Sequence, residues 1–258
     1  MPNDPMLPVI DFGGIKMFDA TGLFPDKRGG AGYNFPARNK SQINGLAFHH
    51  DTAPFFSGDA NDEISRMALI YRLHSTYYTN GYPSGVSGGS GGQWDWSGIG
   101  YHGCIFPSGR IYLVGGLETM RAHVANHNDH LTGFVLAGNF SQDPPLLGSL
   151  LAAGNVLKAM RNYYGFDIEY RGHREWVTQA AWATECPGDT FEDWLPKIRQ
   201  IADAKEVDLA QEINDRIRTA LAPNVVKINQ GLQDVNLTEM QEASTSLKAQ
   251  VDWLIKSK

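Results

Sequence analysis

Three side chains that can bind a transition metal lie at the end of an apolar run, after a glycine and in a predicted turn. His49 closes the apolar run GLAFH, His173 follows a glycine in GHREW, and Cys186 lies in the turn-forming sequence Cys-Pro-Gly. A catalytic zinc ion takes three protein ligands of these types and keeps a fourth position open for water. Residue type alone leaves a second interpretation, because a lone histidine at a strand end is more often structural and a lone cysteine is more often buried.

The cysteine count limits what Cys186 can do. The chain of 258 residues has two cysteines, Cys104 and Cys186, which are too few for a disulfide framework. They could form one bridge, two free thiols, or one thiol and one metal ligand. Cys104 alternates into an apolar strand segment, so we expect a core thiol there. A bridge to Cys186 would destroy the metal set, and we do not favour it.

The composition is that of a globular protein with one sizeable core. Apolar residues make up 42% of the chain and charged residues 19%. The net charge of -6 argues against a general nucleic-acid binder, which would show a basic face. No apolar run approaches the ~20 residues of a membrane helix. The first residues do not have the pattern of an ordinary signal peptide. We therefore expect no nucleic-acid partner and no membrane span.

Alternating strands and helices must position the candidate ligands. We expect strands within residues 43–52, 99–106, 109–116 and 133–140. We expect helices from a cap at Asn61 or Asp62 to about Tyr78, over residues 146–164 and over residues 191–204. The turn Pro-Ser-Gly joins the second and third strands into a hairpin, which supplies antiparallel neighbours. The predicted fold class is α/β, with a mixed central β-sheet flanked by helices.

Composition also divides the chain into three parts. Residues 1–42 are rich in Gly, Pro, Asp and Asn and are predicted to be an irregular lead-in, followed by a main domain at 43–204 and a helical tail at 205–258. Pro223 is expected to break the tail into two helices. The apolar spacing of the tail fits a homo-oligomer seam and a helix packed on its own domain equally well. Trp94 and Trp96, beside a Gly/Ser loop at 84–92, could stack on a sugar or pack on the sheet.

Four motifs then occur in a fixed order: FHHDT, SGIGYHGCIFPSGRIY, AHVANHNDHLTGFVLAGNF and GHREW…TECPGDTF. Together they closely resemble the N-acetylmuramoyl-L-alanine amidases of the peptidoglycan-recognition-protein and phage-lysozyme type, the amidase-2 superfamily. The resemblance runs from residue 43 to residue 194, well over half of the chain. It implies a peptidoglycan-recognition-protein-like fold, with residues 43–204 as a zinc amidase domain.

The resemblance also implies the ligands of a Zn²⁺ cofactor, which fall on His49, His173 and Cys186. Relatives that bind peptidoglycan without cutting it typically lack the cysteine, so its presence here implies catalysis. The stretch WVTQAAWAT makes the gap between His173 and Cys186 longer than is usual in the family. This insertion bears on the local geometry and not on the ligand types.

Three further site residues follow from the same resemblance. Tyr101 matches an active-site tyrosine, which with zinc would stabilise the oxyanion. Thr184 matches a position that is Lys in some phage members and Thr in many recognition proteins, and it could orient the water or the oxyanion. His123 matches a histidine that lines the cleft, and we consider it as a proton shuttle because free histidine titrates near neutral pH.

The implied function is zinc-dependent hydrolysis of the amide bond between N-acetylmuramic acid and L-alanine in peptidoglycan. A non-catalytic peptidoglycan-binding module is the alternative. The implied setting is a phage endolysin without a signal peptide, made in the host cytoplasm and reaching the cell wall at release. A virion-associated lysin and a cytoplasmic recycling amidase fit the same facts. The helical tail would then oligomerise the enzyme, bind the wall or anchor it in a particle.

The remaining polar residues near these motifs have simpler interpretations. Side chains alternate along a strand, so His50 is expected to face away from His49, and His102 away from Tyr101. Asp51 either orients a ligand histidine or caps the strand end. The other histidines are expected to be structural or solvated, and they are His74, His127 and His130.

Overall fold

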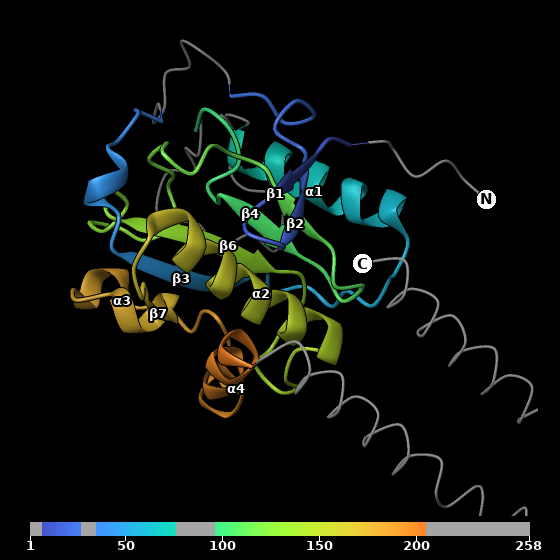
Figure 1. Ribbon diagram of the computed structural model, residues 1–258. Helices are drawn as coiled ribbons and strands as arrows, with labels where there is room; N and C mark the ends of the chain where they lie inside the picture. Colours follow the sequence, from blue (N-terminus) through green and yellow to red (C-terminus); the bar gives the residue numbers. More distant parts are fainter. Residues whose placement is uncertain (1–6, 27–34, 76–95, 205–258) are drawn as a thin grey trace, which may run out of the picture. The chain divides into compact units, whose positions relative to one another are not determined.

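A mixed sheet with helices on both faces forms the body of the protein. The computed structural model describes residues 7–26, 35–75 and 96–204. Within these residues the sheet has seven strands in the order β1-β2-β5-β4-β6-β3-β7. Helices α2 and α4 cover one face, and helix α1 lies on the other (Figure 1). The predicted fold class, an α/β protein with a mixed central sheet, is confirmed.

The elements have the following bounds. The strands are β1 Val9–Asp11, β2 Lys16–Asp19, β3 Gly45–His50, β4 Gly103–Ile105, β5 Ile111–Leu113, β6 Leu131–Leu136 and β7 Glu169–Gly172. The helices are α1 Ala60–Ser75, α2 Leu147–Tyr164, α3 His173–Trp176 and α4 Phe191–Asp203, with short 3-10 turns η1 Lys40–Gln42 and η2 Ala180–Trp182. Strands β4, β6, β3 and β7 run parallel, whereas β5 is antiparallel to β4 as the predicted hairpin requires.

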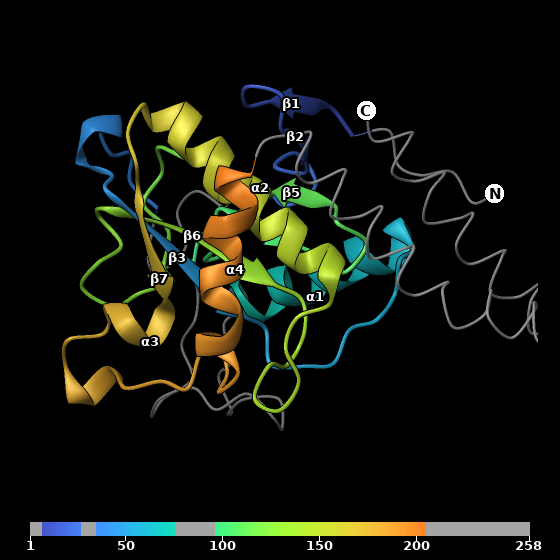
Figure 2. The same ribbon diagram turned by 60° about the horizontal axis from the view of Figure 1, so that its bottom comes forward.

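Strand β3, which lies between β6 and the edge strand β7, has one face in the main core and the other face at the site. Leu46 and Phe48 point into the main core, which α2 and α4 cover. These two helices lie side by side (Figure 2), and Gly154 of α2 allows their close approach, because a Cβ atom there would come within 2.3 Å of Ile201. Since strand side chains alternate, Ala47 and His49 lie on the opposite face.

Two glycines leave room on this second face for the rings of Trp176 and His123. A Cβ atom on Gly45 would lie 2.8 Å from the Trp176 ring, and one on Gly133 of β6 would lie 2.6 Å from Nδ1 of His123. Farther along the sheet, Met67 of α1 packs over β4 and β5. The site therefore forms over β3, β6 and β7, beside the part of the sheet that α1 covers.

Several element predictions need correction. The lead-in at residues 1–42 is not wholly irregular, because β1 and β2 extend the sheet through parallel pairing of β2 with β5. Strand β7 was not predicted at all. Helix α1 begins earlier than expected, and its cap is Asp59, whose Oδ1 accepts a hydrogen bond of 2.7 Å from the amide of Asn61. Helix α2 ends as predicted at Gly165, which has a positive φ of 85°.

Some expectations fall outside the described residues. These are the Gly/Ser loop at 84–92, Trp94, the last residues of the first predicted helix, and the helical tail at 205–258 with its break at Pro223. Among the residues that are described, no helix has the length and apolar character needed to cross a bilayer.

Candidate metal centre

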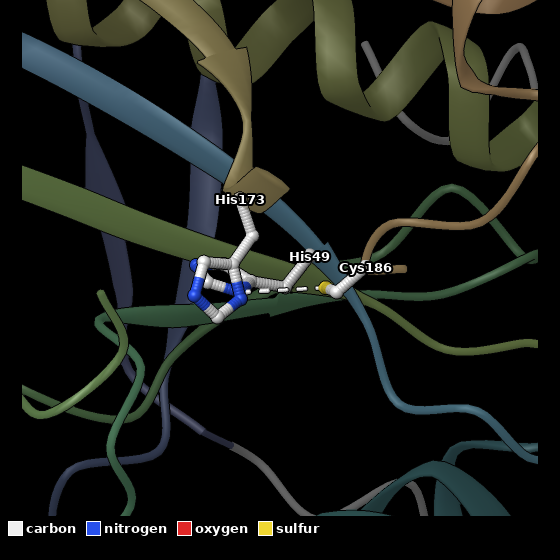
Figure 3. Close-up of side chains that lie close together, drawn as sticks. All are labelled: His49, His173 and Cys186. Carbon is white, nitrogen blue, oxygen red and sulfur yellow. Dashed lines mark hydrogen bonds between the residues drawn. The ribbon is translucent and has the colours of Figure 1, made fainter. Parts of the chain in front are cut away.

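The three predicted ligands meet at the carboxyl ends of two neighbouring parallel strands. Strands β3 and β7 pair in the register Phe48↔Gly172, so the next residues along the chain are His49, still in β3, and His173, the first residue of α3. The two imidazole rings have centroids 4.6 Å apart. Cys186 reaches the same point from the loop before α4, and Figure 3 shows the three side chains converging. The sheet register thus brings together residues that are far apart in the sequence.

The donor atoms fit a zinc ion in type and spacing. One ligand atom from each of His49, His173 and Cys186 lies within 4.8 Å of the other two. The His49 Nδ1 to Cys186 Sγ distance is 3.6 Å, close to the roughly 3.5 Å between nitrogen and sulfur on one tetrahedral zinc. His49 is buried, whereas His173 and Cys186 are partly exposed. A ligand set that is open on one side can leave a coordination position for water.

Burial makes the ligands neutral in the absence of a cation. It lowers the pKa of His173 to about 4, and burial followed by the neighbouring His173 lowers the pKa of His49 well below its usual value. Burial raises the pKa of the Cys186 thiol to about 12. Both histidines therefore offer lone pairs at neutral pH, and a bound dication would supply the positive charge that a Cys186 thiolate needs.

Arg174, the residue that follows His173, holds the turn that carries Cys186. The guanidinium of Arg174 donates to the carbonyl oxygens of Glu185, at 2.7 Å, and of Gly188. It also lies 3.2 Å from the Asp189 carboxylate. The backbone amide of Arg174 donates to the Cys186 carbonyl at 2.9 Å. Arg174 therefore ties the His173 segment to the Cys186 turn.

Thr184 belongs to the same turn. Its hydroxyl accepts a hydrogen bond of 3.2 Å from the backbone amide of Cys186. The Thr184 hydroxyl thus helps to fix the backbone at the candidate ligand Cys186. A direct role for Thr184 on water or on an oxyanion stays a prediction.

Tyr101 lies against the ligand His49. The two rings have centroids 5.0 Å apart. His74, in the last turn of α1, supports the tyrosine, because its Nδ1 accepts a hydrogen bond of 3.0 Å from the Gly100 amide and its ring lies 5.5 Å from that of Tyr101. Burial, followed by the nearby Cys186, raises the pKa of Tyr101 well above its usual value, so the hydroxyl stays protonated and can donate.

His123 lies behind His49, on the side away from Cys186. Its Nδ1 is 3.2 Å from Nε2 of His49, and its Nε2 is 3.3 Å from the Leu131 carbonyl oxygen. Burial, followed by the cation of Arg38, lowers the pKa of His123 to about 3. The ring is therefore neutral at neutral pH in the metal-free chain, and a role for His123 as a proton shuttle stays a prediction.

Other polar residues have structural partners. Asp51 accepts from Arg66 Nε at 2.6 Å and from the Gly138 amide at 2.9 Å, which fits the strand-end interpretation and not the orientation of a histidine. His50 faces Phe140 on the opposite face of the sheet, as expected. Cys104 is a buried free thiol, and Cys186 is also free.

The other loop histidines pair with each other. His127 Nδ1 lies 3.3 Å from His130 Nε2, and both side chains are partly exposed. His102 is buried in the sheet, where its Nδ1 accepts from the Gly133 amide at 2.9 Å. These positions agree with the structural and solvated roles expected for them.

Sequence reasoning missed two arginines that support the site. Arg174 immediately follows a candidate ligand, and this adjacency was the available signal. Arg38 is buried, and its Nη1 lies 2.5 Å from the Leu131 carbonyl oxygen and 2.8 Å from that of Asn128. No local pattern marks Arg38, because its partners are about ninety residues away along the chain.

Together, fold and site define a mixed α/β protein with a candidate His/His/Cys metal centre where two parallel strands and the loop before α4 meet. Residues 39–189 match the family model Amidase_2, described as N-acetylmuramoyl-L-alanine amidase. This match covers more than half of the chain, and the chain belongs to that family. The resemblance inferred from the four motifs is confirmed at the level of the family.

Individual relatives are more distant. The human (Homo sapiens) N-acetylmuramoyl-L-alanine amidase is 29% identical over 103 residues, which are 39% of this chain and 17% of the human protein. Two solved structures are similar at 18% identity. The Drosophila peptidoglycan recognition protein SD has a TM-score of 0.53 over 74% of this chain and 98% of that one. The Ph2119 endolysin of Thermus scotoductus MAT2119 bacteriophage Ph2119 has a TM-score of 0.51, over 73% and 99%. At these identities the two structures establish a shared fold.

Proposed function

We propose that this chain is a zinc-dependent amidase that hydrolyses the bond between N-acetylmuramic acid and L-alanine in peptidoglycan. The observation that carries the proposal is the convergence of His49, His173 and Cys186 within 4.8 Å, in a member of the amidase family. Peptidoglycan is the proposed partner. Zinc is the proposed ion because two imidazoles and a thiolate suit its softness and its tetrahedral geometry.

The proposed mechanism divides the work between the metal and the chain. A bound zinc ion would polarise the amide carbonyl and lower the pKa of a water molecule towards ~7. His49 and His173 contribute neutral nitrogen ligands, and Cys186 contributes negative charge. Tyr101 keeps its proton, so its hydroxyl can donate a hydrogen bond to the carbonyl oxygen as negative charge develops there.

Removing the metal should stop the reaction. We expect the full chain to release intact stem peptides with a free L-alanine amine from purified peptidoglycan. A chelator should abolish the release and added zinc should restore it, because no side chain replaces the polarising ion. Mass analysis of the soluble products, with and without chelator, measures both the cleaved bond and the metal requirement.

Other outcomes of this measurement would change the proposal in defined ways. Cleavage within the glycan or within the stem peptide would keep the hydrolase but reject the proposed bond. Product release that is insensitive to chelator would reject the metal mechanism. A folded, zinc-loaded chain that pulls down with peptidoglycan but releases nothing would identify the non-catalytic binding module.

The proposed setting is that of a lytic enzyme, either a phage endolysin or a virion-associated lysin, and it rests on the resemblance of the motifs. An endolysin made in a bacterial cytoplasm should lyse the cell only when a second protein permeabilises the inner membrane. Co-expression of the chain with and without such a protein, followed by culture turbidity, tests this expectation. Lysis by the chain alone, or no lysis in either culture, would contradict it.

The C-terminal segment is proposed to be dispensable for catalysis. The family match ends at residue 189, before the segment begins. Deletion of residues 205–258 should therefore leave the rate of stem-peptide release from soluble peptidoglycan fragments unchanged. Loss of this activity in a folded, zinc-binding truncation would instead place part of the active site in the tail.

A further inference from the structure

We infer that His123 is a positioning residue that holds His49 in the tautomer required for metal binding. A hydrogen-bonded chain runs from Arg38 through the Leu131 carbonyl and His123 to His49. The inference rests on the metal site of the proposed function. It adds a role for two residues, Arg38 and His123, that do not touch the metal.

The first step concerns the two nitrogens of His49. Nδ1 faces Cys186 Sγ at 3.6 Å, and Nε2 faces His123 Nδ1 at 3.2 Å. A neutral imidazole carries one proton, and a nitrogen that binds a metal must present its lone pair. The proton of His49 must therefore reside on Nε2, and this N–H points at His123.

The second step fixes the proton of His123. Its Nε2 lies 3.3 Å from the Leu131 carbonyl oxygen, which can only accept a hydrogen bond. His123 therefore donates through Nε2 and presents the lone pair of Nδ1 to the N–H of His49. In the pair, Nε2 of each histidine then donates a hydrogen bond, and Nδ1 of each histidine presents a lone pair.

The third step fixes the carbonyl. Arg38 Nη1 donates to the Leu131 oxygen at 2.5 Å, and its other guanidinium nitrogen donates to the Leu117 carbonyl at 3.0 Å. The Leu131 oxygen thus accepts from both Arg38 and His123, which its two lone pairs allow. Arg38 holds the acceptor in place without contacting the site.

Packing leaves His123 little freedom to turn. The ring lies over Gly133, where a Cβ atom would come within 2.6 Å of its Nδ1. The His102 ring meets it edge-on, at a centroid distance of 5.5 Å. The glycine in β6 therefore creates the space in which His123 reaches His49.

The test compares two substitutions at the same buried position that differ in chemistry. His123→Phe keeps a ring and removes the acceptor, whereas His123→Asn keeps an acceptor oxygen near the position of Nδ1. We expect the Phe variant of the full chain to bind zinc about tenfold more weakly in a competition titration. We expect the Asn variant to retain most of the affinity. His130→Phe, in the neighbouring loop, serves as the matched control and should bind zinc as the parent does.

The tautomers can be read directly in the unsubstituted chain. Long-range ¹H–¹⁵N NMR correlations of the zinc-free protein should show both His49 and His123 protonated on Nε2 only. This measurement does not depend on the folding of any variant. A His49 protonated on Nδ1, equal zinc affinities for the Phe and parent proteins, or equal losses in the Phe and Asn variants would each overturn the inference.

These readouts are separate from the test of hydrolysis. A chain with the expected tautomers and zinc affinities that releases no stem peptides would leave the positioning role intact and reject the amidase proposal. Stem-peptide release together with an Nδ1-protonated His49 would do the reverse.

Discussion

Cys186→Ala should eliminate stoichiometric zinc binding and reduce stem-peptide release by at least about a thousandfold, since an enzyme of this type depends on a water whose pKa the metal lowers from ~15.7 to ~7. The substitution leaves His49 and His173 as the two remaining ligands, and a catalytic zinc site needs three. Metal content of the purified protein and product release from peptidoglycan measure the two losses independently.

The second cysteine provides the matched control. Cys104 is also a free thiol, but it is buried in the core between α1 and the sheet. Cys104→Ala should keep the full zinc content and most of the hydrolytic rate. Binding of the Cys186→Ala protein to insoluble peptidoglycan should partly survive, because Tyr101 and the surrounding fold remain. A Cys186→Ala protein that hydrolyses at the parental rate without metal would refute the zinc mechanism.

The elements that sequence could predict are those whose own residues carry the signal. Strand β3 is a continuous buried run that ends in polar residues, and α2 has a helical apolar spacing that ends at Gly165. Strand β7 has no such signal, because only Gly172 of its four residues is buried and its pairing with β3 is what makes it a strand. Strands β1 and β2 are also short, and they too are defined by pairing: β1 pairs with β2, and β2 pairs with β5.

In the site too, the sequence predicts which residues take part but not how their atoms are oriented. The types of the three ligands could be predicted from the motifs around them. The direction of each ring could not, because it depends on contacts between distant segments. His49 meets His123 across 74 residues and Cys186 across 137 residues. Burial of His123 beside Arg38 likewise moved its pKa far from that of free histidine, which residue type alone cannot indicate.

Arg174→Ala should weaken zinc binding by about a hundredfold while leaving the three ligands in place. The substitution removes two charge-assisted hydrogen bonds, to the carbonyls of Glu185 and Gly188, and loss of such supporting contacts costs about 10–100-fold in metal affinity. The Cys186 turn would then have to be ordered by the ion itself. Stem-peptide release should fall most at low zinc concentration and recover in part when zinc is in excess, which separates a positioning role from a direct role in chemistry.

Two further variants sharpen this prediction. Arg174→Lys keeps the charge but loses the planar guanidinium, whose Nη2 reaches both carbonyls while Nη1 and Nη2 face Asp189, so its zinc affinity should fall between those of the parent and the alanine variant. Arg171→Ala is the matched control, because Arg171 lies on the exposed side of the same segment and pairs with Glu169. Parental zinc affinity in Arg174→Ala would mean that the contact of Thr184 with the Cys186 amide holds the thiol without the arginine. An equal loss in Arg171→Ala would mean that the segment responds to any lost charge, and not to the contacts that Arg174 makes with the ligand turn.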